Sequence, residues 1–336
     1  MIQLGVIGTS WISHQFVAAA LETKQYELVG VYSRRAEVAK AFANEHSQTC
    51  WTTADFTAFM ASDRLTTIYI ASPNSYHFEQ AKAAILAGKH VIVEKPAFTN
   101  PEQMTTILTL AKQQGVLFFE AARNIHEENY RRVTQFLAEH GPVTGASLTY
   151  MKYSSRYDDV LAGHEPNIFS LNFAGGALMD LGVYLIYAAV GWFGQPQQSN
   201  YFATKIRTGV DGSGWGVLRY EGFDVSIHTG KTGHSAAATE IYLADGTLVI
   251  DGVQAITQAI FYPNKQQDPY ALALVPSATN PLSEEAAVFA TYLATPDKCN
   301  QTEAYQELTS LARQVNQTLY QMRTMAAITF PSDPIT

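Results

Sequence analysis

Short apolar runs alternate with helical patterns along the first third of the chain. The runs at residues 4–7, 28–32, 67–70, 91–93 and 116–119 are continuous rather than alternating, which is typical of strands buried on both faces. Residues 78–86 and 101–112 carry helix formers at helical spacing, and Gly88 and Gly115 follow as stops. This succession of strands and helices predicts an α/β domain with a doubly wound parallel sheet.

From about Pro142 the pattern changes to strand-like runs at residues 147–153, 216–220, 223–229, 240–243 and 247–250. The pairs Glu221-Gly222 and Asp245-Gly246 between these runs favour hairpins. We expect a helix over residues 176–190, and a second, periodic one is marked by Leu308, Leu311, Val315, Leu319 and Met322. The second half is therefore predicted to be α+β, built on an open, mostly antiparallel sheet.

Length and composition fit two folded domains, which we place at residues 1–121 and 122–336. The chain has 336 residues, of which 47% are hydrophobic and 15% charged. A net charge of −8 argues against nucleic acid as a partner. Cys50 and Cys299 lack Cys or His neighbours at ligand spacing, so we expect no disulfide framework and no metal site. We expect a cytoplasmic protein, because we find neither a signal peptide nor a membrane span.

The turn after the first strand carries part of a dinucleotide-binding pattern. Gly8 holds the first glycine position, whereas Ser10 and Ser13 replace the second and third. The candidate cofactor contacts in this turn are Gly8, Thr9, Ser10, Trp11 and Ile12. After the second strand, Ser33, Arg34 and Arg35 stand where an acidic ribose-binding residue is usual. Two guanidinium groups and a hydroxyl suit a 2′-phosphate, which favours NADP(H), with NAD(H) as the second choice.

Two further motifs resemble the Gfo/Idh/MocA oxidoreductase family. They are Ala71-Ser72-Pro73-Asn74-x-x-His77 and the run from Ala87 to Pro96, which ends in Glu94-Lys95-Pro96. The resemblance implies an N-terminal Rossmann domain that binds the cofactor. It also implies that Lys95 is catalytic and lies beside the nicotinamide, and that the Lys95–Pro96 peptide bond is cis. The remaining cofactor contacts that it suggests are Ser72, Pro73, Asn74, His77 and Glu94, with His77 expected to brace the turn.

The second half contains the matching element, residues 175–184, in which Asp180 and Tyr184 are four apart and would share a helix face. Family members commonly have His at the second position, whereas a subset resembling dihydrodiol, D-xylose and glucose-fructose oxidoreductases has Tyr. The resemblance therefore implies Lys95, Asp180 and Tyr184 as the catalytic residues. Either Tyr184 or Lys95 would handle the proton of the substrate oxygen. Candidate substrate contacts are Arg123, Asn124 and Asn167.

These features predict an NADP(H)-preferring dehydrogenase or reductase that acts on a sugar, polyol or related hydroxy or carbonyl compound. Two other functions stay open. One is a cofactor-retaining hydrolase or lyase of the same family, and the other is a non-catalytic dinucleotide sensor, for which Ser10 and Ser13 are the best argument. We also expect a homodimer or homotetramer, because an exposed apolar sheet face in the second domain would suit a two-fold interface.

Overall fold

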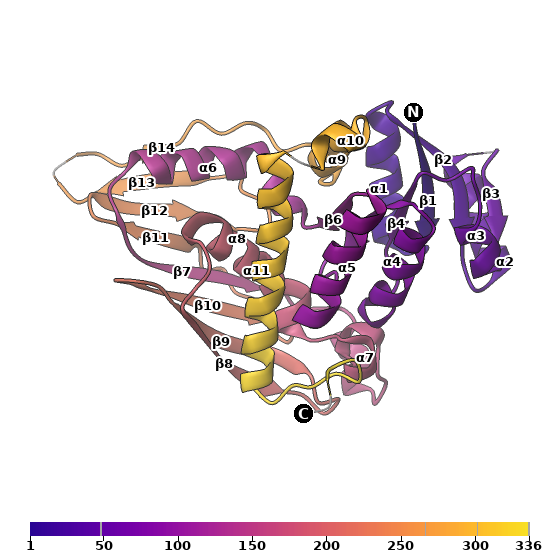
Figure 1. Ribbon diagram of the computed structural model, residues 1–336. Coiled ribbons are helices and arrows are strands. Elements are labelled where there is room, and N and C mark those ends of the chain that lie inside the picture. The colour runs from indigo at the N-terminus through magenta and orange to yellow at the C-terminus, as the bar shows by residue number, and fades with distance from the viewer. Residues whose placement is uncertain (48, 266, 301, 335–336) are drawn as a thin grey trace. The chain divides into compact units, whose positions relative to one another are not determined.

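The computed structural model describes residues 1–47, 49–265, 267–300 and 302–334, and the chain forms two compact units (Figure 1). Unit 1 comprises Met1–Ala121 and Ala278–Arg313, and unit 2 comprises Ala122–Ser277 and Gln314–Thr336. The first change of unit, after Ala121, coincides with the expected domain boundary. The segment Ala278–Arg313 differs from the expectation, since it packs with the N-terminal unit.

Unit 1 is built on a six-stranded parallel sheet. Its strand order is β3 (Trp51–Thr53), β2 (Tyr26–Tyr32), β1 (Ile2–Ile7), β4 (Thr67–Ile70), β5 (His90–Glu94) and β6 (Phe118–Ala121). Helices and one 3₁₀ turn join the strands: α1 (Trp11–Glu22), α2 (Ala36–His46), α3 (Phe56–Met60), η1 (Asn74–Tyr76), α4 (His77–Leu86) and α5 (Pro101–Gln114). The predicted doubly wound sheet is confirmed.

Buried side chains cover both faces of this sheet, as the continuous apolar runs predicted. One core contains Phe16 of α1 and Phe42 of α2, and the other contains Phe59 of α3 and Ile85 of α4. In Figure 1, α4 and α5 lie side by side. Gly115 ends α5 in the left-handed conformation with φ 67°, which a residue without Cβ adopts at no steric cost.

The segment Ala278–Arg313 joins unit 1 through side-chain contacts. It contains α9 (Ser283–Leu293), α10 (Pro296–Cys299) and the start of α11 (Glu303–Met325). The Tyr26 hydroxyl donates to the Ala286 carbonyl at 2.9 Å, and the Phe118 amide donates to the Tyr305 hydroxyl at 2.8 Å. Together with Phe289, which is fully buried, these contacts complete the core on one face of the sheet.

Unit 2 is built on an eight-stranded sheet in which, among the described residues, β7 and β10 are the one pair that runs parallel. The strand order is β14 (Tyr270–Ala271), β13 (Ala259–Pro263), β12 (Gly246–Ile250), β11 (Thr239–Leu243), β7 (Val143–Met151), β10 (Asp224–Gly230), β9 (Asp211–Arg219) and β8 (Gln198–Lys205). Buried and more exposed residues alternate along β9 and β11, so one face of the sheet is packed and the other is open. The predicted, mostly antiparallel sheet is confirmed.

The remaining elements of unit 2 are helical. They are η2 (Arg123–His126), α6 (Glu128–Glu139), α7 (Tyr157–Leu161), η3 (Asn167–Phe169), η4 (Leu171–Phe173), the π-helical turn η5 (Leu178–Gly182), α8 (Val183–Phe193) and the part of α11 from Gln314 onward. Among the described residues, one stretch, Leu171–Phe193, is long and apolar enough to cross a membrane, with a mean hydropathy of 1.6. Since 78% of that apolar window is buried inside the protein, the stretch has the burial of a core helix.

Candidate active site

The candidate cofactor residues of unit 1 follow four of its strands. Gly8 comes after β1, Ser33 after β2, Ser72 after β4, and Lys95 after β5. Because all six strands are parallel, these residues lie at the same edge of the sheet. The strand order reverses between β1 and β4, and open α/β sheets bind ligands at the carboxyl edge beside such a reversal.

Gly8 is the one position of this turn at which a side chain is excluded. Its φ is +96°, and a Cβ added there would lie 2.4 Å from the Ala71 carbonyl oxygen. The close approach arises because β1 and β4 are neighbours, with Ile7 opposite Ile70. The turn after β1 therefore lies against the backbone that leads into Ser72, and it has the bare main chain that a pyrophosphate needs.

The two serines that replace glycines occupy different environments. Ser10 is exposed and precedes the first turn of α1, where its carbonyl oxygen accepts from the Ser13 and His14 amides at 3.0 and 3.2 Å. Ser13 is fully buried, and its hydroxyl has no hydrogen-bond partner among the described residues. Trp11 is 70% exposed. Hence only Ser10 of the two serines presents its side chain at the surface of the turn.

The basic residues after β2 are exposed at the surface. The Arg34 guanidinium lies 5.8 Å from the centre of the Tyr76 ring, and the Arg35 side chain is 74% exposed. Glu37 forms a loose ion pair with Arg35, with 3.9 Å between its Oε1 and the Arg35 Nε. An exposed pair of guanidinium groups, for which the described residues offer this one loose ion pair, is accessible to an anion such as a phosphate.

His77 connects the turn after β4 to the residue that follows Lys95. Its Nε2 lies 2.8 Å from the Ser72 carbonyl oxygen, and its Nδ1 lies 3.3 Å from the Pro96 carbonyl oxygen. Burial lowers the pKa of His77 to about 4, so the ring is neutral near pH 7 and carries a single N–H. The shorter of the two contacts indicates that this N–H donates to the Ser72 carbonyl oxygen. His77 thus braces two segments of the candidate site.

Lys95 is half-buried at the end of β5, and the Lys95–Pro96 peptide bond is cis, which confirms that hypothesis. Buried carboxylates anchor the chain on either side of it. Glu94 Oε1 accepts from the Tyr69 hydroxyl at 2.5 Å, and Glu120 Oε1 accepts from the Ala97 amide at 2.9 Å. The backbone that carries the lysine is therefore fixed from inside unit 1.

In unit 2, the helix that carries Asp180 and Tyr184 is anchored at its start by a buried aspartate. Asp211 Oδ2 accepts from the Leu178 amide at 2.7 Å and from the Tyr201 hydroxyl at 2.6 Å. Burial raises the pKa of Asp211, and its hydrogen bonds partly counter that effect. Gly176, with φ +120°, is required beside it, because an added Cβ would lie 2.1 Å from Asp211 Oδ1.

The helix expected over residues 176–190 begins as the π-helical turn η5 and continues as α8. From residue 177 to residue 190, which the structure describes throughout, Asp180, Leu181 and Tyr184 are the partly exposed residues and all others are buried. π-Helical turns are frequent at functional sites. Asp180 and Tyr184 thus lie on the accessible side of an otherwise buried helix.

Lys231, just beyond β10, is a candidate that we did not predict. Its Nζ lies 2.6 Å from Asp180 Oδ2 and 3.2 Å from the Ile168 carbonyl oxygen, and it lies 4.4 Å from the centre of the Phe169 ring. The Lys231 side chain is only 2% exposed, against 32% for Asp180. A lysine at the end of a predicted strand was the signal available, as it was for Lys95.

The three candidate substrate residues have different surroundings. Asn124 is buried, and its Nδ2 donates to the Tyr184 and Val253 carbonyl oxygens at 3.4 and 3.2 Å. Arg123 forms an ion pair with Glu127 at 2.9 Å, and Asn167 is exposed at the start of η3. The Asn124 amide thus holds the backbone of Tyr184, and its contact with a substrate stays a prediction.

Comparison with known proteins gives matches to both halves of the chain. Residues 2–122 match a family model described as "Oxidoreductase family, NAD-binding Rossmann fold", and residues 130–249 match the "GFO/IDH/MocA C-terminal domain". The chain is 38% identical over 253 residues to scyllo-inositol 2-dehydrogenase (NADP(+)) IolU of Bacillus subtilis, covering 75% of this chain and 77% of that one. It is 36% identical over 294 residues to the uncharacterized oxidoreductase YgjR of Escherichia coli, covering 87% and 88% of the two chains.

A solved structure with the same fold is KijD10, a 3-ketoreductase from Actinomadura kijaniata in complex with NADP and TDP-benzene. The TM-score is 0.80, and the match covers 96% of this chain and 97% of that chain at 20% identity. At that identity the likeness establishes the shared fold.

Proposed function

The chain belongs to the Gfo/Idh/MocA oxidoreductase family, and from that premise we propose that it is an NADP(H)-preferring dehydrogenase or reductase of a sugar, polyol or related hydroxy or carbonyl compound. The observation that carries the proposal is the position of the cofactor candidates after β1, β2, β4 and β5, at the carboxyl edge where the strand order reverses.

The residues of unit 1 fit a dinucleotide. The bare backbone at Gly8 and the exposed start of α1 would hold the pyrophosphate, and Ser33, Arg34 and Arg35 would hold the 2′-phosphate of NADP. Ser72, Pro73, Asn74 and Glu94 lie at the ends of the adjacent strands β4 and β5, where the nicotinamide half would bind. When bound, the nicotinamide supplies or accepts hydride.

The chain's own residues handle the substrate oxygen and its proton. We assign proton transfer to the Tyr184 hydroxyl or the Lys95 ammonium, and substrate orientation to Asp180. Lys231 holds the Asp180 carboxylate in one orientation through a 2.6 Å ion pair, and Asn124 holds the Tyr184 backbone. These contacts support preorganised catalytic groups in unit 2.

Steady-state kinetics of Lys95→Ala and Tyr184→Phe test the catalytic roles. We expect each variant to lose about 10²–10⁴-fold in turnover, the range for a missing general acid or base, with nearly unchanged NADPH affinity. Tyr262→Phe, at a tyrosine 43% exposed on β13, is the matched control and should keep full activity. Full activity in both catalytic variants would contradict the assignment.

Fluorescence titration with NADPH and NADH tests the cofactor preference. We expect tighter NADPH binding by the wild type, and we expect the double variant Arg34→Ala/Arg35→Ala to lose this preference while its NADH affinity stays the same. Equal losses for both cofactors would place the arginines away from the 2′-phosphate. Binding of neither cofactor by the wild type would refute the enzyme proposal.

The open face of the unit 2 sheet supports a homodimer or homotetramer. Phe202, Trp215 and His228 are register neighbours across β8, β9 and β10, and Phe202 and Trp215 are 74% and 57% exposed. An aromatic row of this kind suits a two-fold interface. Analytical ultracentrifugation of the wild type and of Trp215→Glu tests this, with dissociation in the variant as the expected result.

Both cysteines are free thiols, which supports a cytoplasmic location.

A further inference from the structure

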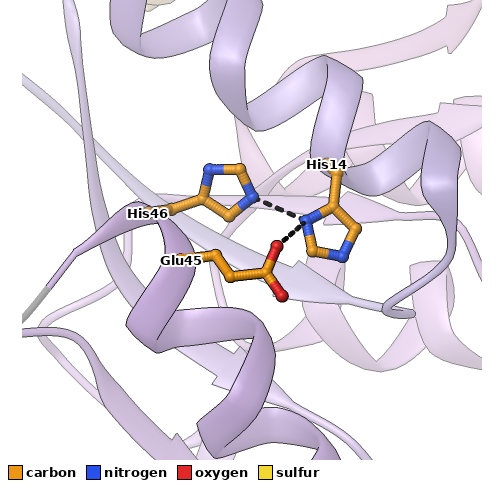
Figure 2. A group of neighbouring side chains, drawn as sticks. All are labelled: His14, Glu45 and His46. Atoms are coloured by element: carbon orange, nitrogen blue, oxygen red, sulfur yellow. Dashed lines mark hydrogen bonds and ion pairs between the residues drawn. The ribbon is translucent and has the colours of Figure 1, made fainter.

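Three potential metal ligands come together on two helices of unit 1. His14 lies on α1, and Glu45 and His46 lie at the end of α2 (Figure 2). His14 Nδ1 is 2.9 Å from His46 Nε2 and 3.3 Å from Glu45 Oε2. The three ligand atoms all lie within 4.8 Å of one another. None of these residues belongs to the proposed cofactor or catalytic groups.

A buried aromatic ring holds the two imidazoles in place. The ring centres of His14 and Phe42 are 4.3 Å apart, and those of Phe42 and His46 are 5.0 Å apart. Phe42 itself is 2% exposed and belongs to the core of unit 1. The His14 and Glu45 side chains are 32% and 64% exposed. The group is therefore rigid on its inner side and open to ions from solvent on the other.

The two distances from His14 Nδ1 are close to those required by one shared ion. Two ligands that are each about 2.0–2.1 Å from a tetrahedral Zn²⁺ are separated by about 3.3 Å. The observed separations from His14 Nδ1 are 2.9 and 3.3 Å. His14 Nδ1 faces both the His46 imidazole and the Glu45 carboxylate. A single hydrogen on that nitrogen can donate a good hydrogen bond to only one of these two groups. A cation at the common centre would satisfy all three groups.

We propose that His14, Glu45 and His46 form a binding site for a divalent transition-metal ion, with Zn²⁺ as the reference ion and solvent completing its coordination. Two imidazole nitrogens and one carboxylate oxygen suit Zn²⁺, Cu²⁺ or Ni²⁺ better than Mg²⁺ or Ca²⁺, which prefer oxygen ligands.

Occupation of this site would join α1 to α2. These two helices begin directly after the turns that carry Ser10 and Arg35, so the ion would brace the supports of both candidate phosphate-binding turns. We had expected no metal site, because the cysteines have no ligand partners. The pairing of His14 with His46, 32 residues apart, arises only from the packing of the two helices.

Competition between the full-length protein and a chromogenic chelator for Zn²⁺ tests the proposal directly and does not depend on enzymatic activity. We expect one Zn²⁺ per chain in the wild type. We expect His46→Gln and Glu45→Gln each to weaken binding by at least about tenfold, since even the outer partners of metal ligands contribute about 10–100-fold. The matched control is His234→Gln, at an exposed histidine in unit 2, which should bind like the wild type.

Two results would overturn the site: wild-type binding weaker than about 1 mM, or equal binding by the wild type and both ligand variants. Glu45→Gln changes an exposed side chain, so it keeps the test valid if His46→Gln fails to fold. Circular dichroism without metal checks the fold of each variant. Replacement of Zn²⁺ by Co²⁺ gives a second readout, because the intensity of its visible absorption reports whether the coordination is tetrahedral.

Discussion

Acidification should destabilise unit 1 through His77. The ring is fully buried, and burial lowers the pKa of His77 from its ordinary value of 6.5 to about 4. Between these two values the unfolded chain binds a proton that the folded chain does not, so the free energy of unfolding falls as the pH falls. The contribution of His77 is fully present above about pH 6.5 and is lost progressively toward pH 4.

The size of the effect follows from the same two pKa values. At pH 5 the unfolded imidazole is almost fully protonated and the folded one almost fully neutral, which removes about 2 kcal/mol of stability relative to pH 8. His126, whose pKa burial also lowers to about 4, adds a loss of its own in the wild type. Comparison with a variant that lacks only His77 therefore isolates the contribution of that one ring.

Urea unfolding of the wild type and of His77→Gln at pH 8 and pH 5 measures the contribution of His77 to the pH dependence of stability. We expect the variant to lose about 2 kcal/mol less than the wild type between the two pH values, even if it is less stable at pH 8. His234→Gln, at an exposed histidine, should behave like the wild type. Equal pH dependence in the wild type and His77→Gln, or an NMR titration of the His77 ring near its ordinary pKa, would refute the reasoning.

Three further substitutions have expected outcomes. Gly8→Ala should lower NADPH affinity at least about tenfold in a fluorescence titration, because the Cβ of the alanine would lie 2.4 Å from the Ala71 carbonyl oxygen. Unchanged affinity would show that the turn is not part of the cofactor site. Ser13→Ala should keep stability or raise it by about 1 kcal/mol in urea unfolding, because the buried hydroxyl has no described partner; a loss would reveal a hydrogen bond to it. Lys231→Met should lower kcat at least about tenfold and shift the pH profile of kcat, because Asp180 loses the cation that orients it, while the affinity for NADPH stays the same. An unaltered pH profile would assign Lys231 a purely structural role.

The sequence predicted the parallel sheet because its strands are buried on both faces and therefore appear as uninterrupted apolar runs. It did not predict β3, which has only three residues, all half-buried, or β8, where polar residues interrupt the pattern. The assignment of Ala278–Arg313 to unit 1 could not be foreseen either. Its contacts include the hydrogen bond between Tyr26 and Ala286, which are 260 residues apart, and such pairs leave no local pattern.

Short motifs gave the candidate residues of unit 1, whereas contacts created by packing leave no motif in the sequence. Lys95 and His77 stand in motifs, and the structure places both at the carboxyl edge of the sheet. Lys231 gains its importance only from the fold, which brings its ammonium to Asp180. A sequence also does not tell which way a side chain points, and the amide of Asn124, a candidate substrate contact, points to the backbone of Tyr184.

The imidazole of His77 contacts the carbonyl oxygens of Ser72 and Pro96, so the turn after β4 and the segment after Lys95 rest on the same side chain. For protein engineering, these two segments are a single exchangeable part rather than two independent loops. A graft that replaces the Ser72–Asn74 turn with the turn of a relative should carry residues 72–77 and 94–97 together. Exchange of the turn alone would place a foreign backbone against the His77 ring, whose position fits the native turn. The ring would then shift and displace Lys95 together with the turn.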